Sequence, residues 1–339
     1  MKKLKLLIIV FLTVPAIFLS SCDRGEDIGD GNIITPSFTI LKEYMIANEL
    51  DINNILSGPG GTVKFVVGTP AEADLPAFLA KYYIMDIRSA DAYNAGHIGG
   101  AKNVAFKDIL TEAANADKQI LVVCYSGQTA CYATSLLRLY GYSDTRALKW
   151  GMSSWNEATA ASWNKQIGSN PAEGNSNWTY SSPPANKIYS DPNLASLSQD
   201  GADILRKRVE IVVENGFKNV SNADVLAAPS NYFVNNYFSL IDYDDFGHIS
   251  NALREKEELL LVGNGYQTMD PDASAKIVSY CYTGQTSAVV SAWLNVLGYD
   301  AYSLLFGMNG MYHGNSAWDK ANLNQWGVGS HPKDLPLVQ

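Results

Sequence analysis

Short apolar runs alternate with helix-spaced segments along the chain. Residues 82–87 and 120–123 are almost wholly apolar and lead into polar residues, which predicts buried strands. Between residues 129 and 140 the apolar side chains recur on one helical face, and Gly141 follows as a helix stop signal. Residues 146–148 are typical of a further strand. This alternation predicts an α/β fold with an open parallel sheet flanked by helices.

The same order of segments returns in the second half. Residues 237–242 match the predicted strand that contains Asp86, and residues 286–297 predict a helix that stops at Gly298. Gly141 and Gly298 each lie 17 residues after a cysteine (141 − 124 and 298 − 281). The chain is therefore predicted to be an internal duplication of a domain of about 150 residues, which is too long a period for a solenoid.

A cysteine loop stands at the carboxyl end of one predicted strand in each half, where open parallel sheets bind their ligands. The two loops are 281 − 124 = 157 residues apart, and five of their seven positions are identical. They are Cys124-Tyr125-Ser126-Gly127-Gln128-Thr129-Ala130 and Cys281-Tyr282-Thr283-Gly284-Gln285-Thr286-Ser287.

Composition narrows the classes of function. The chain has 339 residues and a net charge of −9 with a pI near 5.0, which argues against a nucleic-acid partner. The cysteines are isolated and have no histidine at ligand spacing, so neither a metal nor another cofactor is expected.

A loop cysteine is useful chemically when it is a thiolate. Neither loop contains Lys or Arg, so stabilisation of the anion must come from the helix N-terminus and from backbone N–H groups. The dipole is worth about 0.3–1 kcal/mol, and up to about 2 kcal/mol when partly buried, which lowers a pKa by about one unit. Gly127 and Gly284 suit a tight nest of amides. These features predict a nucleophile near neutral pH with a pocket for a small anion. The alternative is that Cys124 and Cys281 are buried small residues, as predicted for Cys131, whose counterpart is Ala288.

Together these segments resemble the rhodanese (sulfurtransferase) domain. The resemblance is carried by Asp86-Ile87-Arg88, by residues 93–101, by the cysteine loop, and by Gly151 and Trp155. It implies two tandem rhodanese-like domains, in which the loop cysteine takes sulfane sulfur as a persulfide and passes it to cyanide or a thiol. It leaves the donor open among thiosulfate, 3-mercaptopyruvate, polysulfide and a protein persulfide. A membrane-tethered sulfur carrier with little turnover is the alternative.

The second half departs from the motif. Asp242-Tyr243-Asp244 stands in place of D-x-R, and His248 follows Asp242 by 6 residues, whereas His97 follows Asp86 by 11, which predicts a deletion of five residues. Asp86 and Arg88 are expected to form an ion pair that braces the fold. His97 and His248 are expected to be structural. Both loops lack the arginine of the C-x5-R phosphatase motif, which excludes that chemistry.

The N-terminus predicts export. Three lysines precede an apolar run over residues 6–19, and Leu19-Ser20-Ser21-Cys22 resembles a bacterial lipobox. The expectation is a signal peptide over residues 1–21, a lipid on Cys22 and a location in the bacterial cell envelope, anchored to a membrane. The alternative is an ordinary signal peptide.

The remaining boundaries follow from composition. Residues 22–34 form a polar tether, residues 35–168 the first domain, and residues 187–331 the second, with a tail over residues 332–339. Residues 169–186 are rich in Pro, Asn and Ser and form the predicted linker, in which Trp178 and Tyr180 are candidates for docking on a domain.

Overall fold

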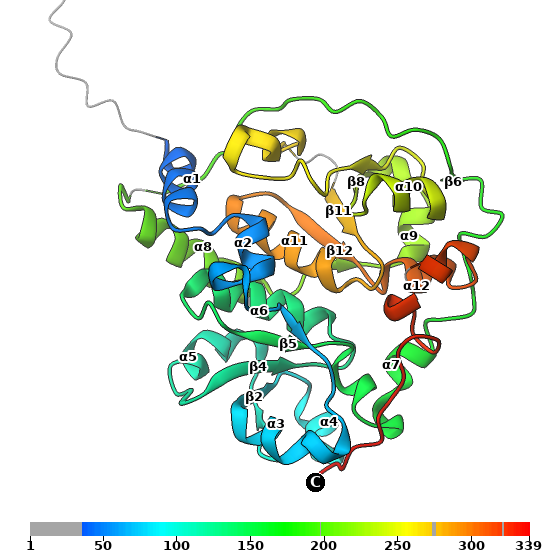
Figure 1. The fold of residues 1–339 in the computed structure, drawn as a ribbon. Coiled ribbons are helices and arrows are strands. Elements are labelled where there is room, and N and C mark those ends of the chain that lie inside the picture. The colour runs from blue at the N-terminus through cyan, green and yellow to red at the C-terminus, as the bar shows by residue number, and fades with distance from the viewer. Residues whose placement is uncertain (1–35, 197, 273–275, 321) are drawn as a thin grey trace, which may run out of the picture. The chain divides into compact units, whose positions relative to one another are not determined.

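Two five-stranded parallel sheets form the framework of the computed structural model (Figure 1). The structure describes residues 36–339 apart from residues 197, 273–275 and 321. The predicted signal peptide, Cys22 and the tether lie outside the described residues. Within the described ranges, no helix has the length and apolarity needed to cross a membrane. Both sheets belong to one compact unit, Thr35–Gln339.

The first sheet has the strand order β1-β5-β4-β2-β3, and all of its pairings are parallel. The central strands β2 and β4 are apolar and almost wholly buried, because helices cover both faces of a parallel sheet. These strands confirm the predictions for residues 82–87, 120–123 and 146–148, with shifts of at most one residue. Their bounds are β1 (Val66–Val67), β2 (Tyr82–Asp86), β3 (Lys102–Asn103), β4 (Gln119–Val123) and β5 (Arg146–Leu148).

The second sheet has the order β10-β8-β11-β12-β7, which is the first order read in reverse when each strand is replaced by its counterpart. All of its pairings are also parallel. The predicted duplication is therefore present in the topology. The bounds are β7 (Asn219–Val220), β8 (Tyr232–Asn236), β10 (Leu253–Arg254), β11 (Lys276–Tyr280) and β12 (Ala301–Leu304).

The strand predicted over residues 237–242 is wrong. The strand is β8, and residues 240–246 form the helix α10, which Ser239 caps by accepting a hydrogen bond from the Asp242 N–H. Asn236 pairs with Tyr280 as Asp86 pairs with Val123, so Asn236 is the counterpart of Asp86. Asn236 to His248 spans 12 residues against 11 in the first half, so the predicted deletion of five residues is wrong as well.

Helices flank both sheets, and the two that follow the cysteine loops pack against each other (Figure 1). These two are α6 and α11, and nearly all of their residues are buried. The helices are α1 (Ser37–Ala47), α2 (Ile52–Ser57), α3 (Leu75–Lys81), α4 (Ala90–Ala95), α5 (Ile109–Ala113), α6 (Gln128–Tyr140), α7 (Ala161–Asn164), α8 (Gly201–Asn215), α9 (Asn222–Ala227), α10 (Leu240–Phe246), α11 (Gln285–Leu297) and α12 (Gly307–Tyr312).

Segments at both ends of the described chain cross between the halves. Helix α1, from the N-terminal side, packs on α8. Near the C-terminus, Val338 pairs with His97, and Pro336 accepts a hydrogen bond from the Trp155 indole. Within the predicted linker, β6 (Trp178–Thr179) pairs antiparallel with β9 (His248–Ile249), so Trp178 docks on the second half, as anticipated. The predicted domain boundaries stay predictions.

Candidate active site

Cys124 lies between the end of β4 and the start of α6. Its Sγ accepts hydrogen bonds from the backbone N–H groups of Gly127 at 3.1 Å and Ala130 at 3.3 Å. Gly127 has φ of 88°, a left-handed conformation that turns the loop toward the sulfur. The amide nest predicted from the loop is therefore formed.

Burial nevertheless dominates the electrostatics of Cys124. The side chain is 2% exposed, and burial raises the pKa of its thiol. Amide hydrogen bonds from Ala130, Ser126 and Gly127 oppose that rise, and the Asp86 carboxylate adds to it. The predicted lowering of the Cys124 pKa is thus wrong in direction, because it weighed the helix terminus and omitted the cost of placing a charge away from water.

The Cys281 loop has the same position in the second half, between β11 and α11. The Ser287 N–H donates to Cys281 Sγ at 3.4 Å, and the Ser287 hydroxyl lies 3.8 Å from the sulfur. That hydroxyl also shares a hydrogen bond of 2.8 Å with Ser303 Oγ on β12. The final residue of the predicted loop is therefore a direct contact of the sulfur.

A cavity of about 440 Å³ adjoins Cys281. Helix α2 contributes one wall, and the segment after β10 contributes another, which includes Lys256 and Glu257. Lys256 is half-buried and has no hydrogen bond or ion pair with any described residue, whereas Glu257 pairs with Arg254. The lining residues are Asn53, Leu56, Tyr237, Lys256, Glu257, Cys281, Tyr282 and Thr286. The cavity wall thus includes Lys256, and Glu257 in its pair with Arg254, beside a loop that has no charge of its own.

The tyrosine after each cysteine contacts the helix that follows the neighbouring strand. The Tyr282 hydroxyl donates to Asp242 Oδ2 at 2.5 Å, and its ring stacks on Phe238. Burial, followed by the bond to Asp242, raises the pKa of Tyr282, so this hydroxyl stays protonated. Tyr125, which is 43% exposed, instead lies 2.9 Å from Ser89 Oγ. Asp242 therefore holds the cavity wall instead of continuing a D-x-R motif.

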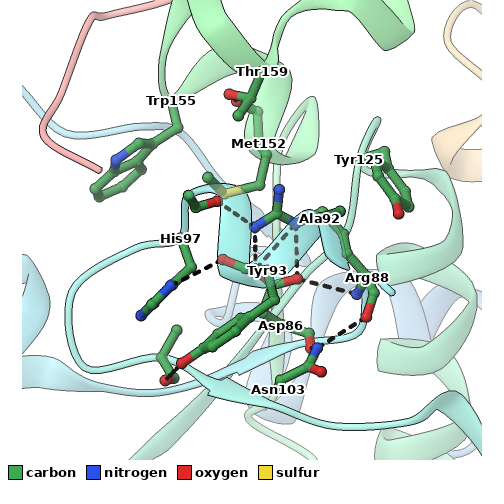
Figure 2. Close-up of polar contacts among 12 residues, drawn as sticks. Asp86, Arg88, Ala92, Tyr93, His97, Asn103, Tyr125, Met152, Trp155 and Thr159 are labelled. Carbon is green, nitrogen blue, oxygen red and sulfur yellow. Dashed lines mark hydrogen bonds and ion pairs between the residues drawn. The ribbon is translucent and has the colours of Figure 1, made fainter. Parts of the chain in front are cut away.

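Asp86 and Arg88 form the expected ion pair, with a separation of 2.6 Å and both side chains buried (Figure 2). Arg88 also donates to the Gly96 carbonyl at 2.8 Å, which ties the strand end to the next turn. In the second half Asn236 Oδ1 accepts from the Phe238 N–H, as Asp86 Oδ1 accepts from the Arg88 N–H. An uncharged pair thus replaces the ion pair at the matching position.

The two motif histidines contact tyrosines. His97 stacks on Tyr93 and shares a hydrogen bond of 3.1 Å with its carbonyl (Figure 2). His248 stacks on Tyr243 in the same way, and burial lowers the pKa of its ring. These contacts agree with the structural role that we expected for both residues.

Each cysteine is held through its backbone carbonyl by a turn that follows a neighbouring strand. The turn after β5 contacts Cys124, and the turn after β12 contacts Cys281. The Met152 N–H donates to the Cys124 carbonyl at 2.8 Å, and the Met308 N–H donates to the Cys281 carbonyl at 3.0 Å. The glycines before these methionines have no room for a side chain, because a Cβ would lie 2.3 Å from Cys124 O at Gly151 and 2.1 Å from Cys281 O at Gly307.

Cys131 lies in α6 and is 1% exposed, and burial raises its pKa well above the ordinary value. The described cysteines, Cys124, Cys131 and Cys281, are all free thiols. These observations agree with a packing role for Cys131.

Three residues of the cavity were not predicted from the sequence: Lys256, Asn53 and Leu56. Asn53 and Leu56 come from α2 of the first half, more than 200 residues before Cys281 in the sequence. Only the packing of distant segments brings them to the loop. No local spacing could have indicated them.

Comparison with known proteins assigns the family. A family model described as a rhodanese-like domain matches residues 69–158. Thiosulfate sulfurtransferase GlpE of Shewanella oneidensis is 37% identical over 23% of this chain and 78% of its own length. The GlpE protein of Pseudomonas putida (strain GB-1) is 36% identical over 21% of this chain and 67% of its own length. A solved thiosulfate sulfurtransferase from Pseudomonas aeruginosa is 16% identical, with a TM-score of 0.28, over 79% of this chain and 45% of that chain. From the match to the first relative, the chain belongs to the rhodanese family.

Proposed function

We propose that the protein is a sulfurtransferase that moves sulfane sulfur through a persulfide on Cys281. The observation that carries this proposal is the position of Cys281, which opens onto a cavity of about 440 Å³ at the start of α11. Cavities of about 300–1,000 Å³ suit small-molecule ligands. The match to thiosulfate sulfurtransferases supports the reaction class; the family model covers residues 69–158, which contain Cys124, and the internal duplication extends the assignment to Cys281.

The reaction is a double displacement. The Cys281 thiol loses its proton to solvent, and the thiolate attacks the outer sulfur of the donor. With thiosulfate, the S–S bond of the donor breaks, a new S–S bond forms on the enzyme, and sulfite leaves with the bonding electron pair. Cyanide then attacks the terminal sulfur, thiocyanate leaves, and the thiolate is regenerated. A thiol acceptor would instead leave as a persulfide.

A backbone amide and the N-terminus of α11 stabilise the Cys281 thiolate in this scheme. The Ser287 N–H points at the sulfur at 3.4 Å, and α11 is long enough to have a full dipole. Such a helix terminus stabilises an anion by about 0.3–1 kcal/mol at an exposed site, and by up to about 2 kcal/mol when partly buried. The uncharged loop therefore stabilises the anion only modestly, and a nearby cation would stabilise it further.

Lys256 is that cation in our proposal. Lys256 lines the same cavity as Cys281, and its ammonium group has no partner among the described residues. An anionic donor would supply one. Thiosulfate, 3-mercaptopyruvate and polysulfide all fit this requirement, so the donor among these three is left to experiment.

A persulfide carrier with little turnover is the second candidate, and the burial of both loop cysteines, which are 2% and 3% exposed, favours it. A thiol whose pKa is raised by burial is a slow nucleophile at neutral pH. In this second candidate function Cys124 holds sulfur for delivery to a partner protein, and Cys281 carries out the multiple-turnover reaction.

We also propose that a lipid on Cys22 anchors the protein to a membrane of the bacterial cell envelope. The order of lysines, apolar run, small residues and cysteine supports this proposal. The polar residues 22–34 would then serve as the tether.

A donor screen tests the function. Thiocyanate release is followed with cyanide as acceptor and with thiosulfate, 3-mercaptopyruvate or polysulfide as donor. We expect multiple turnovers with at least one donor and none in a Cys281→Ser chain. A stable persulfide without turnover for every donor would favour the carrier, and no persulfide at all would contradict both candidates.

A further inference from the structure

The side chains of Gln128 and Gln285 cross between the two halves. Gln128 begins α6, and its Oε1 accepts a hydrogen bond from the Phe306 N–H at 2.7 Å. Gln285 begins α11, and its Oε1 accepts from the Trp150 N–H at 3.2 Å. Gln128 and Gln285 are 1% and 5% exposed, so both bonds are shielded from water. The two contacts are equivalent under the internal duplication.

Each glutamine therefore binds the turn that supports the other half's cysteine. Phe306 has φ of 60° and precedes Gly307, where the chain turns back to place the Met308 N–H on the Cys281 carbonyl. Trp150 has φ of 67° and has the same place relative to Cys124. Residues with a side chain adopt such left-handed conformations only where the surroundings hold them. The glutamine oxygens are part of those surroundings.

The loops are shaped to admit these side chains. A Cβ on Gly284 would lie 2.2 Å from Gln128 Oε1, and a Cβ on Gly127 would lie 2.8 Å from Gln285 Oε1. Gln128 also donates through Nε2 to Ser126 Oγ at 3.0 Å, so one amide group touches its own loop and the opposite turn. The two cysteine loops are thus connected directly through their own residues.

We propose that Gln128 is a positioning residue for Cys281 and that Gln285 is a positioning residue for Cys124. Each half completes the cysteine loop of the other, so a single half lacks one support of its own loop. The assignment of Gln128 rests on the proposed function only in that Cys281 is the thiol that carries sulfur. The hydrogen bonds themselves are independent of the substrate.

Alkylation by iodoacetamide measures this positioning without any sulfur transfer. The parent is the full chain with Cys124→Ser and Cys131→Ala, in which Cys281 is the only cysteine of residues 36–339. Gln128→Met removes the acceptor at similar length, and we expect Cys281 to react about three- to tenfold more slowly, the range for loss of one hydrogen bond.

A matched control lies in the same helix pair. Asn295 Nδ2 donates to Tyr132 Oη at 3.2 Å, which is another hydrogen bond between α11 and α6. Tyr132→Phe removes it without touching either loop and should leave the alkylation rate within twofold of the parent. Equal slowing in Tyr132→Phe and Gln128→Met would overturn the proposal, as would a parental rate in a folded Gln128→Met chain.

The reciprocal variant gives an independent arm. Gln285→Met, in a chain with Cys281→Ser and Cys131→Ala, should slow alkylation of Cys124 to a similar extent. This arm decides the question if Gln128→Met does not fold, and an unchanged Cys124 rate in it would contradict the proposal. In the turnover assay Gln128→Met should lower kcat and leave KM within twofold. A chain that shows the alkylation pattern but never takes up sulfur would contradict the proposed function alone.

Discussion

Replacement of Lys256 by methionine should weaken the reaction of Cys281 with anions. Lys256 shares the cavity with Cys281, is half-buried and has no described partner. A cavity of about 440 Å³ is roughly 8 Å across, and two unit charges about that far apart interact by about 0.5 kcal/mol in water and by about 2 kcal/mol at an effective dielectric constant of about 20. Half-burial places Lys256 between these limits, so we expect a loss of about 1–2 kcal/mol, which is about five- to thirtyfold in rate.

Two alkylating agents of similar shape isolate this charge effect. Iodoacetate is an anion and iodoacetamide is neutral, so the ratio of their rates at Cys281 reports the local charge without requiring sulfur transfer. The ratio should fall about five- to thirtyfold in Lys256→Met and stay near the parental value in Lys256→Arg. The KM for thiosulfate should rise in the same direction, and added salt should reduce the difference between the variants.

Lys207→Met is the matched control, because Lys207 is exposed on α8 and its loss changes the net charge equally. A ratio in Lys256→Met that stays within twofold of the parent would refute the assignment of Lys256. An equal fall in Lys207→Met would show that only the overall charge of the protein matters.

Three further predictions concern stability and location. Gly307→Ala should destabilise the fold by about 2 kcal/mol or more in a urea titration, since its Cβ would lie 2.1 Å from Cys281 O; a loss below about 0.5 kcal/mol would contradict that geometry. Burial raises the pKa of Glu255 to about 7, so its contribution to the free energy of unfolding is complete below about pH 4.5 and is lost as the pH rises through about 7. In Glu255→Gln the loss of stability between about pH 4.5 and about pH 7 should therefore be smaller by about 2–4 kcal/mol. A stability profile against pH that is unchanged in this variant would contradict the role of Glu255. Cys22→Ala should shift the protein from membranes to the aqueous fraction, and continued partition into membranes would exclude the lipid anchor.

The sequence predicted the central strands β2, β4 and β5 of the first half because most of their residues are apolar, whereas the two-residue edge strands β1 and β3 were not predicted. The second half failed at β8, whose last residues, Asn235 and Asn236, are buried and polar. Their amide groups donate to Ser279 Oγ and Tyr280 Oη on the neighbouring strand β11, which is a pairing that a hydropathy pattern cannot register. The apolar residues that follow β8 lead into α10, and because they resemble a buried strand, the strand was predicted several positions too late.

The candidate site was predictable in its loops but not in its surroundings. The repeated motif indicated both cysteines and both glutamines, whereas Lys256 and the wall from α2 reach Cys281 only through tertiary packing. The pKa direction of Cys124 was also missed, because the sequence shows the helix terminus but not the depth of burial. The repeated motif also showed that Gln128 and Gln285 occupy matching positions, but the sequence did not indicate that each one binds a turn of the opposite half.

Intact-protein mass spectrometry after exposure to thiosulfate tests whether Cys281 carries the transferred sulfur. The parent chain and Cys124→Ser should each gain the mass of one sulfur atom on Cys281, and added cyanide should remove it. Cys281→Ser should gain no sulfur mass that cyanide removes at the rate at which the parent chain turns over. A cyanide-sensitive sulfur that persists in Cys281→Ser and disappears in Cys124→Ser would assign the transferred sulfur to Cys124 instead of Cys281.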